Sequence, residues 1–231
     1  MVGVIVNACV IAVGGVLGML FGHALPERIK QTIIQGIGLA VILIGVHMAI
    51  QTNNSLVVIG SLVTGGIIGE WINIEGKLEY LGQWLEAKAA RGSQSGGFTK
   101  AFMTTSLIYC VGAMAIMGSL ESGLKGNNDI LYAKAAIDGI SAIIFASSMG
   151  GGVIVSAVPV FIYQGAITLS AGSIQGLLPG PVLTEMSATG GLLILGIGLA
   201  ILEIKDVKVG NLLPAIFTAI PLTWLATYFG K

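Results

Sequence analysis

Residues 134–165 read KAAIDGISAIIFASSMGGGVIVSAVPVFIYQG, and this stretch decides the class of the fold. Two apolar runs, at residues 131–148 and 152–171, are separated here by little more than glycine. A helix needs about 20 mostly apolar residues to cross the roughly 30 Å hydrocarbon core of a bilayer. The stretch therefore predicts two successive transmembrane helices, although the short connection leaves open whether both cross fully.

Six more apolar runs of similar length lie on either side of this stretch. They cover residues 3–22, 33–51, 55–74, 99–118, 185–203 and 209–229. We therefore expect an all-α membrane protein with about eight transmembrane helices, in which residues 1–231 form a single polytopic membrane domain.

The composition excludes an ordinary soluble domain. Charged residues make up 10% of the chain and hydrophobic residues 55%, with a mean hydropathy of +0.93. Soluble domains carry roughly 25% charged residues. Glycine contributes 35 of 231 residues, which favours close packing between membrane helices. The formal net charge is zero, so nothing indicates a nucleic-acid partner.

The motifs of common catalytic sites are missing from the sequence. It contains no HExxH, no Cys–His cluster, no P-loop and no GxSxG. Cys9 and Cys110 lie inside apolar runs, and we expect both to be small buried hydrophobic residues. We therefore expect neither an enzyme nor a cofactor, and the sequence does not identify a metal.

Residues 75–98 form the only strongly polar connection. Leu78, Leu81 and Trp84 fall on one helical face, which predicts a short amphipathic helix in the membrane interface. A helix packed on the rest of the protein is the alternative. The final RGSQSGG is expected to be a flexible joint.

The distribution of Lys and Arg predicts the orientation. With eight spans and an external N-terminus, the inside loops hold Arg28, Lys30, Lys77, Lys88, Arg91, Lys100, Lys205 and Lys208. Only Lys125, Lys134 and Lys231 remain outside. The positive-inside rule therefore favours both termini outside and residues 75–98 in the cytoplasm. A count of seven spans would move Lys205 and Lys208 outside and weaken this argument.

An internal repeat is indicated by three ordered similarities at offsets near 150 residues. GVIVSA at 152–157 resembles GVIVNA at 3–8, GGLLILGIGLAIL at 190–202 resembles GIGLAVILIGVHM at 36–48, and VGNL at 209–212 resembles IGSL at 59–62. Spans one to three would then correspond to spans six to eight in the opposite direction, flanking spans four and five. Inverted repeats are typical of secondary transporters, but chance similarity between glycine-rich helices is the alternative.

Asp138 is the sharpest candidate for a functional site, because an ionisable group inside hydrocarbon is costly. Lys134 lies one helical turn before it and can neutralise it, and Ser141 lies three residues after it on nearly the same face. We expect Asp138 to bind a cationic solute, an ion or a coupling proton. A purely structural Asp–Lys pair is the alternative.

Several other residues complete the candidate site. Three consecutive glycines follow the Asp138 span, and they predict either a helix break that helps form the site or a tight turn. Glu185 follows Pro179-Gly180-Pro181 and is expected to cap its own helix. The three glycines, Gly150, Gly151 and Gly152, are therefore candidates for the site. The other candidates are polar residues inside or at the end of apolar runs, namely Asn7, Ser156, Gln164 and Glu70.

A family resemblance supports the membrane assignment. CVGAMAIMGSLESGL at 110–124 and the stretch at 134–165 resemble the bacterial DUF554 family of unknown function. VNACVIAVGGVLGMLFG at 6–22 and IGEWINIEGKLE at 68–79 fit the same family. The resemblance implies a multi-span protein of the bacterial cytoplasmic membrane, and it assigns no chemistry to individual residues.

These observations lead to a transporter of a small solute or ion as the first hypothesis, with a polar midplane site near Asp138 and the Gly150–Gly152 break. An oligomeric channel is one alternative, because small glycine-rich subunits can share a pore. A non-transporting scaffold or sensor is the other. Apart from the lipid bilayer, the expected partners are a small cationic solute, an ion or a proton, and further copies of the chain.

Overall fold

The computed structural model describes residues 1–22, 26–89, 97–110, 113–174, 176 and 178–229. Every regular element in these residues is a helix. The helices are α1 (Val2–Gly22), α2 (Glu27–Ala49), α3 (Ser55–Ile72), α4 (Ile74–Ala89), α5 (Gly97–Cys110), α6 (Ala113–Lys125), α7 (Asp129–Met149), α8 (Gly152–Val155), α9 (Ala157–Ile174), α10 (Gly180–Ile201), α11 (Val209–Leu212) and α12 (Pro214–Phe229). The all-α membrane fold predicted from the sequence is confirmed.

Seven stretches in the described residues are long and apolar enough to cross a membrane. They agree with seven of the eight predicted spans, with α8–α9 and α11–α12 each forming one stretch. The eighth predicted span, 99–118, falls on α5 and α6, which are bent by 58° relative to each other, so its crossing of the membrane as one broken span stays a prediction. Residues 111–112, between these two helices, lie outside the described residues.

The chain forms two compact units, and neither of them is continuous in sequence. Unit 1 comprises residues 1–36, 79–110 and 114–173, and unit 2 comprises residues 37–78, 111–113 and 174–231. Each unit is described below by itself.

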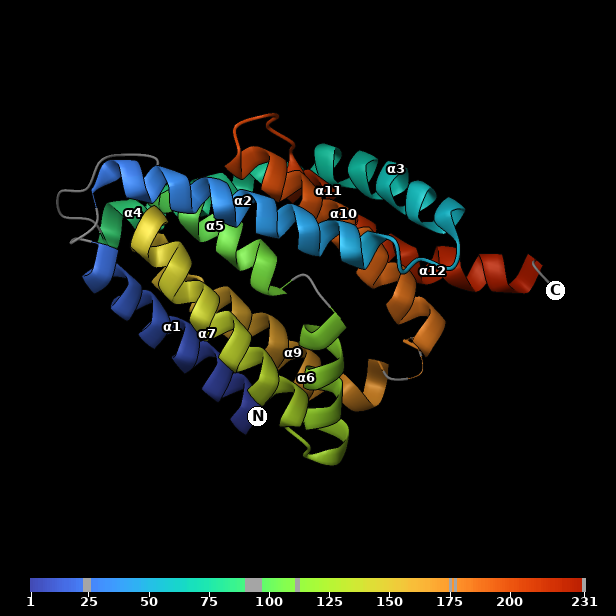
Figure 1. Cartoon of the computed structure of the whole chain (residues 1–231). Helices are drawn as coiled ribbons and strands as arrows, with labels where there is room; N and C mark the ends of the chain where they lie inside the picture. The colour runs from blue at the N-terminus through green and yellow to red at the C-terminus, as the bar shows by residue number, and fades with distance from the viewer. Residues whose placement is uncertain (23–25, 90–96, 111–112, 175, 177, 230–231) are drawn as a thin grey trace. The chain divides into compact units, whose positions relative to one another are not determined.

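Unit 1 is built around the contact between α1 and α7 (Figure 1). The helices meet through glycine, which lets two backbones approach closely. A Cβ atom built on Gly14 would lie 2.5 Å from the carbonyl oxygen of Gly139, and one on Gly18 would lie 2.9 Å from the Ala146 Cβ. Because both residue numbers rise together along the contact, α1 and α7 run in the same direction.

This parallel contact bears on the number of membrane crossings. Two spans that run in the same direction must be separated by an odd number of crossings. The helices α2 and α3 supply two of these crossings. We infer that the bent pair α5–α6 supplies the third, which gives eight crossings.

Unit 2 is held together by antiparallel helix pairs. In the pair α3–α12, a Cβ atom built on Gly65 would lie 2.7 Å from the Ala215 Cβ, and Thr218 Oγ1 donates to the carbonyl oxygen of Ser61 at 3.1 Å. In the pair α2–α10, a Cβ atom on Gly45 would lie 2.7 Å from the carbonyl oxygen of Gly191. Glycine again permits the close approach.

Two spans contain breaks that follow from proline. Pro159 has no N–H to donate to the carbonyl group of Val155, and α8 ends at Val155. Pro214 likewise cannot donate to the carbonyl group of Gly210, and α11 ends at Leu212.

The expectation that Glu185 caps its own helix is wrong. Glu185 is buried in α10 and accepts hydrogen bonds from Thr52 Oγ1 at 2.5 Å, Asn53 N at 2.8 Å and Asn54 N at 3.2 Å. These groups precede α3, so the carboxylate fixes the α2–α3 connection against α10. The favourable helix dipole at the start of α3 adds to this contact.

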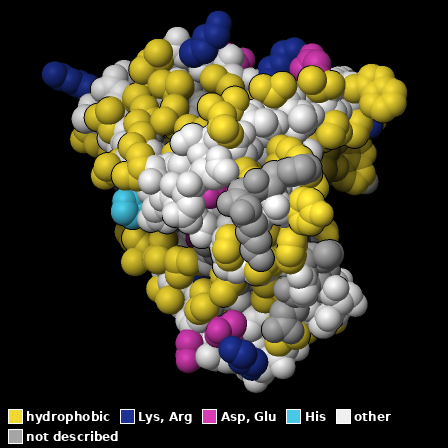
Figure 2. Space-filling model, turned by 90° about the vertical axis from the view of Figure 1, so that its right-hand side faces the viewer, with side chains coloured by type: hydrophobic (Ala, Val, Ile, Leu, Met, Phe, Trp, Pro, Cys, Tyr) yellow, Lys and Arg dark blue, Asp and Glu magenta, His cyan; other side chains and the backbone are white. Residues whose placement is uncertain are grey.

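The protein surface matches a lipid environment. Hydrophobic side chains cover much of the face in Figure 2, and charged side chains occur there only in small groups. Cys9 is one of the exposed residues of α1, and Cys110 is partly exposed, so the expectation that both are buried is wrong. The two cysteines are free.

The polar connection contains the predicted helix, α4, with Tyr80, Leu81 and Trp84 exposed. Its position in the membrane interface stays a prediction. Most of the RGSQSGG joint lies outside the described residues.

We expect Gly45→Ala to lower the free energy of unfolding by about 1–3 kcal/mol, because the added methyl group collides with the α10 backbone. Gly36→Ala on the same helix is the matched control, since nothing lies within 4 Å of a Cβ atom there. Thermal unfolding in detergent measures both changes. Equal stability of the two variants would contradict the proposed role of glycine.

The crossing count predicts that α4 and the end of α6 lie on opposite sides of the membrane. Gln83→Cys and Lys125→Cys test this in a Cys9→Ser, Cys110→Ser background, using a membrane-impermeant maleimide on intact cells. We expect labelling of position 125 from outside and of position 83 only after permeabilisation. Labelling of both from the same side would exclude eight crossings, and a reversed pattern would overturn the orientation alone.

Candidate functional site

The candidate site lies on one face of α7 in unit 1. Lys134, Asp138 and Ser141 are spaced by four and three residues, so they project from the same side of the helix. Asp138 is one residue from the midpoint of α7 (Asp129–Met149). If α7 spans the bilayer, the carboxylate therefore lies near the bilayer midplane.

Lys134 and Asp138 form a buried ion pair. Lys134 Nζ lies 2.5 Å from Asp138 Oδ2, and the two residues retain only 6% and 5% of their accessible surface. Burial of two charges carries a desolvation penalty of several kcal/mol for each ion, which the contact between them offsets. The expected neutralisation of Asp138 by Lys134 is therefore present in the structure.

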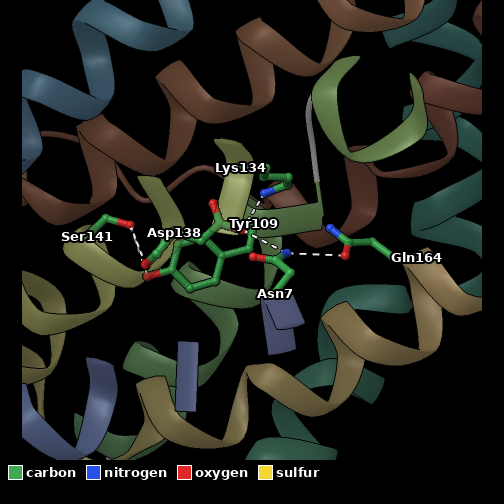
Figure 3. Close-up of polar contacts among 6 residues, drawn as sticks. All are labelled: Asn7, Tyr109, Lys134, Asp138, Ser141 and Gln164. Carbon is green, nitrogen blue, oxygen red and sulfur yellow. Dashed lines mark hydrogen bonds and ion pairs between the residues drawn. The ribbon is translucent and has the colours of Figure 1, made fainter. Parts of the chain in front are cut away.

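Two amide side chains from other helices extend the pair into a cluster (Figure 3). Asn7 of α1 donates through Nδ2 to Asp138 Oδ2 at 3.1 Å and to Gln164 Oε1 of α9 at 3.2 Å. Both amides are completely buried. Three spans that are distant in sequence thus meet at one polar centre.

The amides also present atoms that have no partner among the described residues. Asn7 Oδ1, an acceptor, and Gln164 Nε2, a donor, are buried and make no hydrogen bond there. Such groups usually cost about 1–3 kcal/mol each, so they are rare in folded proteins. The described residues contain eight unpartnered buried side-chain atoms, and six of them belong to unit 1. Besides the two on Asn7 and Gln164, the atoms in unit 1 are on Ser106, Ser119, Ser148 and Thr168.

Tyr109 of α5 closes another side of the cluster. Its ring lies 5.9 Å from Lys134 Nζ and packs edge-on against Phe145, with 6.4 Å between ring centroids. Ser141 Oγ lies 3.4 Å from the Tyr109 hydroxyl oxygen and donates to the Asp138 carbonyl oxygen at 2.9 Å. The ring face offers the ammonium group an attractive quadrupole.

The sequence predicted Asn7, Lys134, Asp138, Ser141 and Gln164 as site residues, and the structure brings them together. The sequence did not indicate Tyr109. Tyr109 carried no comparable signal, because its proximity to Lys134 arises from the packing of α5 on α7.

Ser156 was expected to contribute from the sixth span. It is fully buried, but its hydroxyl donates to the Val153 carbonyl oxygen at 2.6 Å, within its own turn. It therefore lies at the break between α8 and α9 and stabilises that break locally.

The triglycine segment forms a tight turn, which was the alternative to a break within a site. Gly150 has φ of 87°, a conformation that glycine adopts without strain, and Gly152 packs closely on Phe98 and Ala101 of α5. Gly150 follows Asp138 by twelve residues, or about 18 Å along a helix. Gly150, Gly151 and Gly152 thus lie about three turns from the carboxylate, and their contribution to a solute site stays a prediction.

Glu70 belongs to a separate set of contacts in unit 2. Its carboxylate accepts from Lys208 Nζ at 3.0 Å and from Asn211 Nδ2 at 2.6 Å. Asn211 Oδ1 accepts from the backbone N–H of Glu75 at 2.7 Å. These contacts join the end of α3 and the start of α4 to the start of α11.

Metal ligands are not gathered in the described part of the chain. No group of three or more His, Cys, Asp or Glu side chains there could hold a metal ion. The chemistry of the cluster in unit 1 is that of charge pairing and amide hydrogen bonding.

Comparison with known proteins places the chain in a family. The model for "Protein of unknown function (DUF554)" matches residues 2–224. The chain belongs to the DUF554 family. It is 33% identical over 236 residues to "Uncharacterized protein YqgA" of Escherichia coli (strain K12), covering 98% of this chain and 99% of that protein.

A second relative gives the membrane character by name. The chain is 29% identical over 234 residues to "Uncharacterized membrane protein YdfK" of Bacillus subtilis (strain 168), covering 100% of this chain and 99% of that protein. No solved structure matches the chain. The predicted family is confirmed.

The ion pair predicts a pattern of coupled stability. Asp138→Asn or Lys134→Met alone should lower the free energy of unfolding by about 3–5 kcal/mol, because each leaves a buried charge without its partner. Together the substitutions should cost clearly less than the sum of the two. Denaturation in detergent measures this difference.

The control is the pair Glu121–Lys125, in which Lys125 is exposed and Glu121 partly exposed, with the same four-residue spacing and a 3.6 Å separation. Glu121→Gln and Lys125→Met should each change stability by less than about 1 kcal/mol. Additive effects at Lys134 and Asp138 would contradict a tightly coupled buried pair.

Proposed function

We propose that the protein transports a small polar solute or ion across the bacterial cytoplasmic membrane, at the cluster formed by Asn7, Lys134, Asp138 and Gln164. The supporting observation is a buried ion pair beside two amides with unpartnered polar atoms, at the middle of a helix long enough to span the membrane. Ionisable residues inside membrane helices are costly and commonly mark solute, ion or proton pathways.

The directions of the paired helices support the inverted repeat that motivates this proposal. Each helix of the first predicted repeat contacts its counterpart in an antiparallel arrangement. Asn7 near the start of α1 contacts Gln164 late in α9, whereas Gly15 faces Ile154 of α8. The pairs α2–α10 and α3–α12 are antiparallel in the same way. Inverted repeats commonly place their substrate site where the repeats meet.

One of these contacts is also reciprocal. The pentapeptide GIGLA occurs at 36–40 and again at 196–200. A Cβ atom on Gly38 would lie 2.6 Å from Leu202, and one on Gly198 would lie 2.6 Å from Ile42. These two contacts show that α2 and α10 run antiparallel, but the offset of 160 residues differs from the offset near 150 of the predicted repeat. The superposition of residues 3–72 on 152–221 stays a prediction.

Uptake into vesicles containing the purified full-length protein tests the proposed function. The vesicles are incubated with a defined mixture of amino acids, sugars, amines, organic acids and inorganic ions, and their contents are measured by mass spectrometry. At least one solute should accumulate about tenfold above protein-free vesicles, with saturable kinetics. The matched control is Asp138→Asn/Lys134→Met, which removes both charges without leaving one unpaired.

The result that contradicts the proposal is uptake that does not differ from protein-free vesicles for any solute, or uptake that is equal in the charge-free variant. Non-saturating flux accompanied by single-channel current would replace the transporter with the channel alternative.

A further inference from the structure

The cluster in unit 1 carries one positive and one negative charge, and therefore no net charge. Lys134 Nζ and Asp138 Oδ2 neutralise each other at 2.5 Å in a buried environment. A solute with a net charge that separated this pair would leave one charge without a counter-charge, where electrostatic energies are large. A solute carrying one charge of each sign would leave every charge paired.

The two amides offer hydrogen bonds of the same complementary kind. Asn7 Oδ1 can accept from an ammonium group, and Gln164 Nε2 can donate to a carboxylate. Both atoms are buried and lack a partner in the part of the chain that the structure describes. The hydrogen bond from Asn7 Nδ2 to Gln164 Oε1 links the two side chains, so the free acceptor and the free donor lie in one cluster (Figure 3).

The bonds described above involve only one carboxylate oxygen of Asp138 and the ammonium group of Lys134. Asp138 Oδ2 accepts from both Lys134 and Asn7, whereas Oδ1 accepts neither bond. An ammonium group has three N–H donors, and one from Lys134 is directed at Asp138. Each partner can thus bind a solute group of opposite charge.

We propose that the site binds a small zwitterion with an ammonium and a carboxylate group close together, the simplest class being α-amino acids. This inference rests on the transport function proposed above. The solute ammonium group donates to Asp138 and Asn7 Oδ1, and the solute carboxylate accepts from Lys134 and Gln164 Nε2. The two charges must be close in the solute because Lys134 and Asp138 are adjacent on one helix.

Uptake of four radiolabelled probes into vesicles containing the full-length protein tests the proposal. Glycine and L-alanine are the zwitterions, while methylammonium and acetate each carry one of the two charged groups. We expect glycine or L-alanine to accumulate at least about tenfold above protein-free vesicles, with neither single-charge probe doing so.

A variant tests the assigned contacts. Gln164→Glu keeps the size of the side chain but replaces the Nε2 donor with a second oxygen, which repels a carboxylate. Uptake of the amino acid should fall at least about tenfold. Gln83→Glu, at an exposed position on α4, is the matched control and should leave uptake unchanged. Because the four-probe comparison uses the unaltered protein, it decides the question even if Gln164→Glu does not fold.

The outcomes separate this inference from the proposed function. Uptake of methylammonium or acetate without either amino acid would overturn the zwitterion site and leave transport standing. Accumulation of a different class of solute from the mixture, with none of the four probes taken up, would have the same consequence. No uptake in either experiment would overturn both proposals.

Discussion

Close backbone contact through glycine is the constraint on which the rest of this structure depends. Membrane helices have no hydrophobic drive to associate, because lipid is as apolar as their side chains, so they associate through packing and polar contacts. Here the contact of Gly14 with the Gly139 backbone brings α1 against α7, and Gly45 and Gly191 do the same for α2 and α10. The first contact fixes the level at which Asn7 meets Asp138. Glycine thus positions the polar cluster although no glycine belongs to it.

The polar cluster in turn restricts the packing of its helices. A separated Asp138 or Lys134 would be a charge in a medium of low dielectric constant, and a separated Asn7 would lose two hydrogen bonds. These costs favour one arrangement of α1, α7 and α9. The atoms left without partners on Asn7 and Gln164 serve no such structural purpose. The proposed solute site uses these two atoms, whereas a purely structural ion pair would not need them.

Much of the fold could be predicted from the sequence, because a helix of about 20 apolar residues matches the thickness of a bilayer. Apolar runs of this length are longer than those of most helices in soluble proteins. The Asp138–Lys134 pair was predictable because a charged residue is rare in such an apolar run. The spacing of four residues then places Lys134 beside Asp138 on one face of a helix. Their contacts with Asn7 and Gln164 could not be predicted, because those depend on which helix faces pack together. The triglycine segment was ambiguous, since glycine suits both a tight turn and a break. The bend between α5 and α6 was hidden because no proline and no charged residue interrupts residues 101–118.

The actual breaks in the spans follow proline, and their positions bear on how such a protein could move. Pro159 and Pro214 each remove one backbone hydrogen bond near the start of a span, at α8–α9 and α11–α12. Gln164 lies five residues beyond Pro159, on the longer part of its span. A change of angle at Ser156 would therefore shift Gln164 relative to Asn7 while leaving α8 packed on α5 through Gly152. Asp138 and Lys134 stay together on the continuous helix α7. At the proposed site, we therefore expect the two charges to keep their relative positions, whereas a bend at Ser156 would change the position of the Gln164 amide.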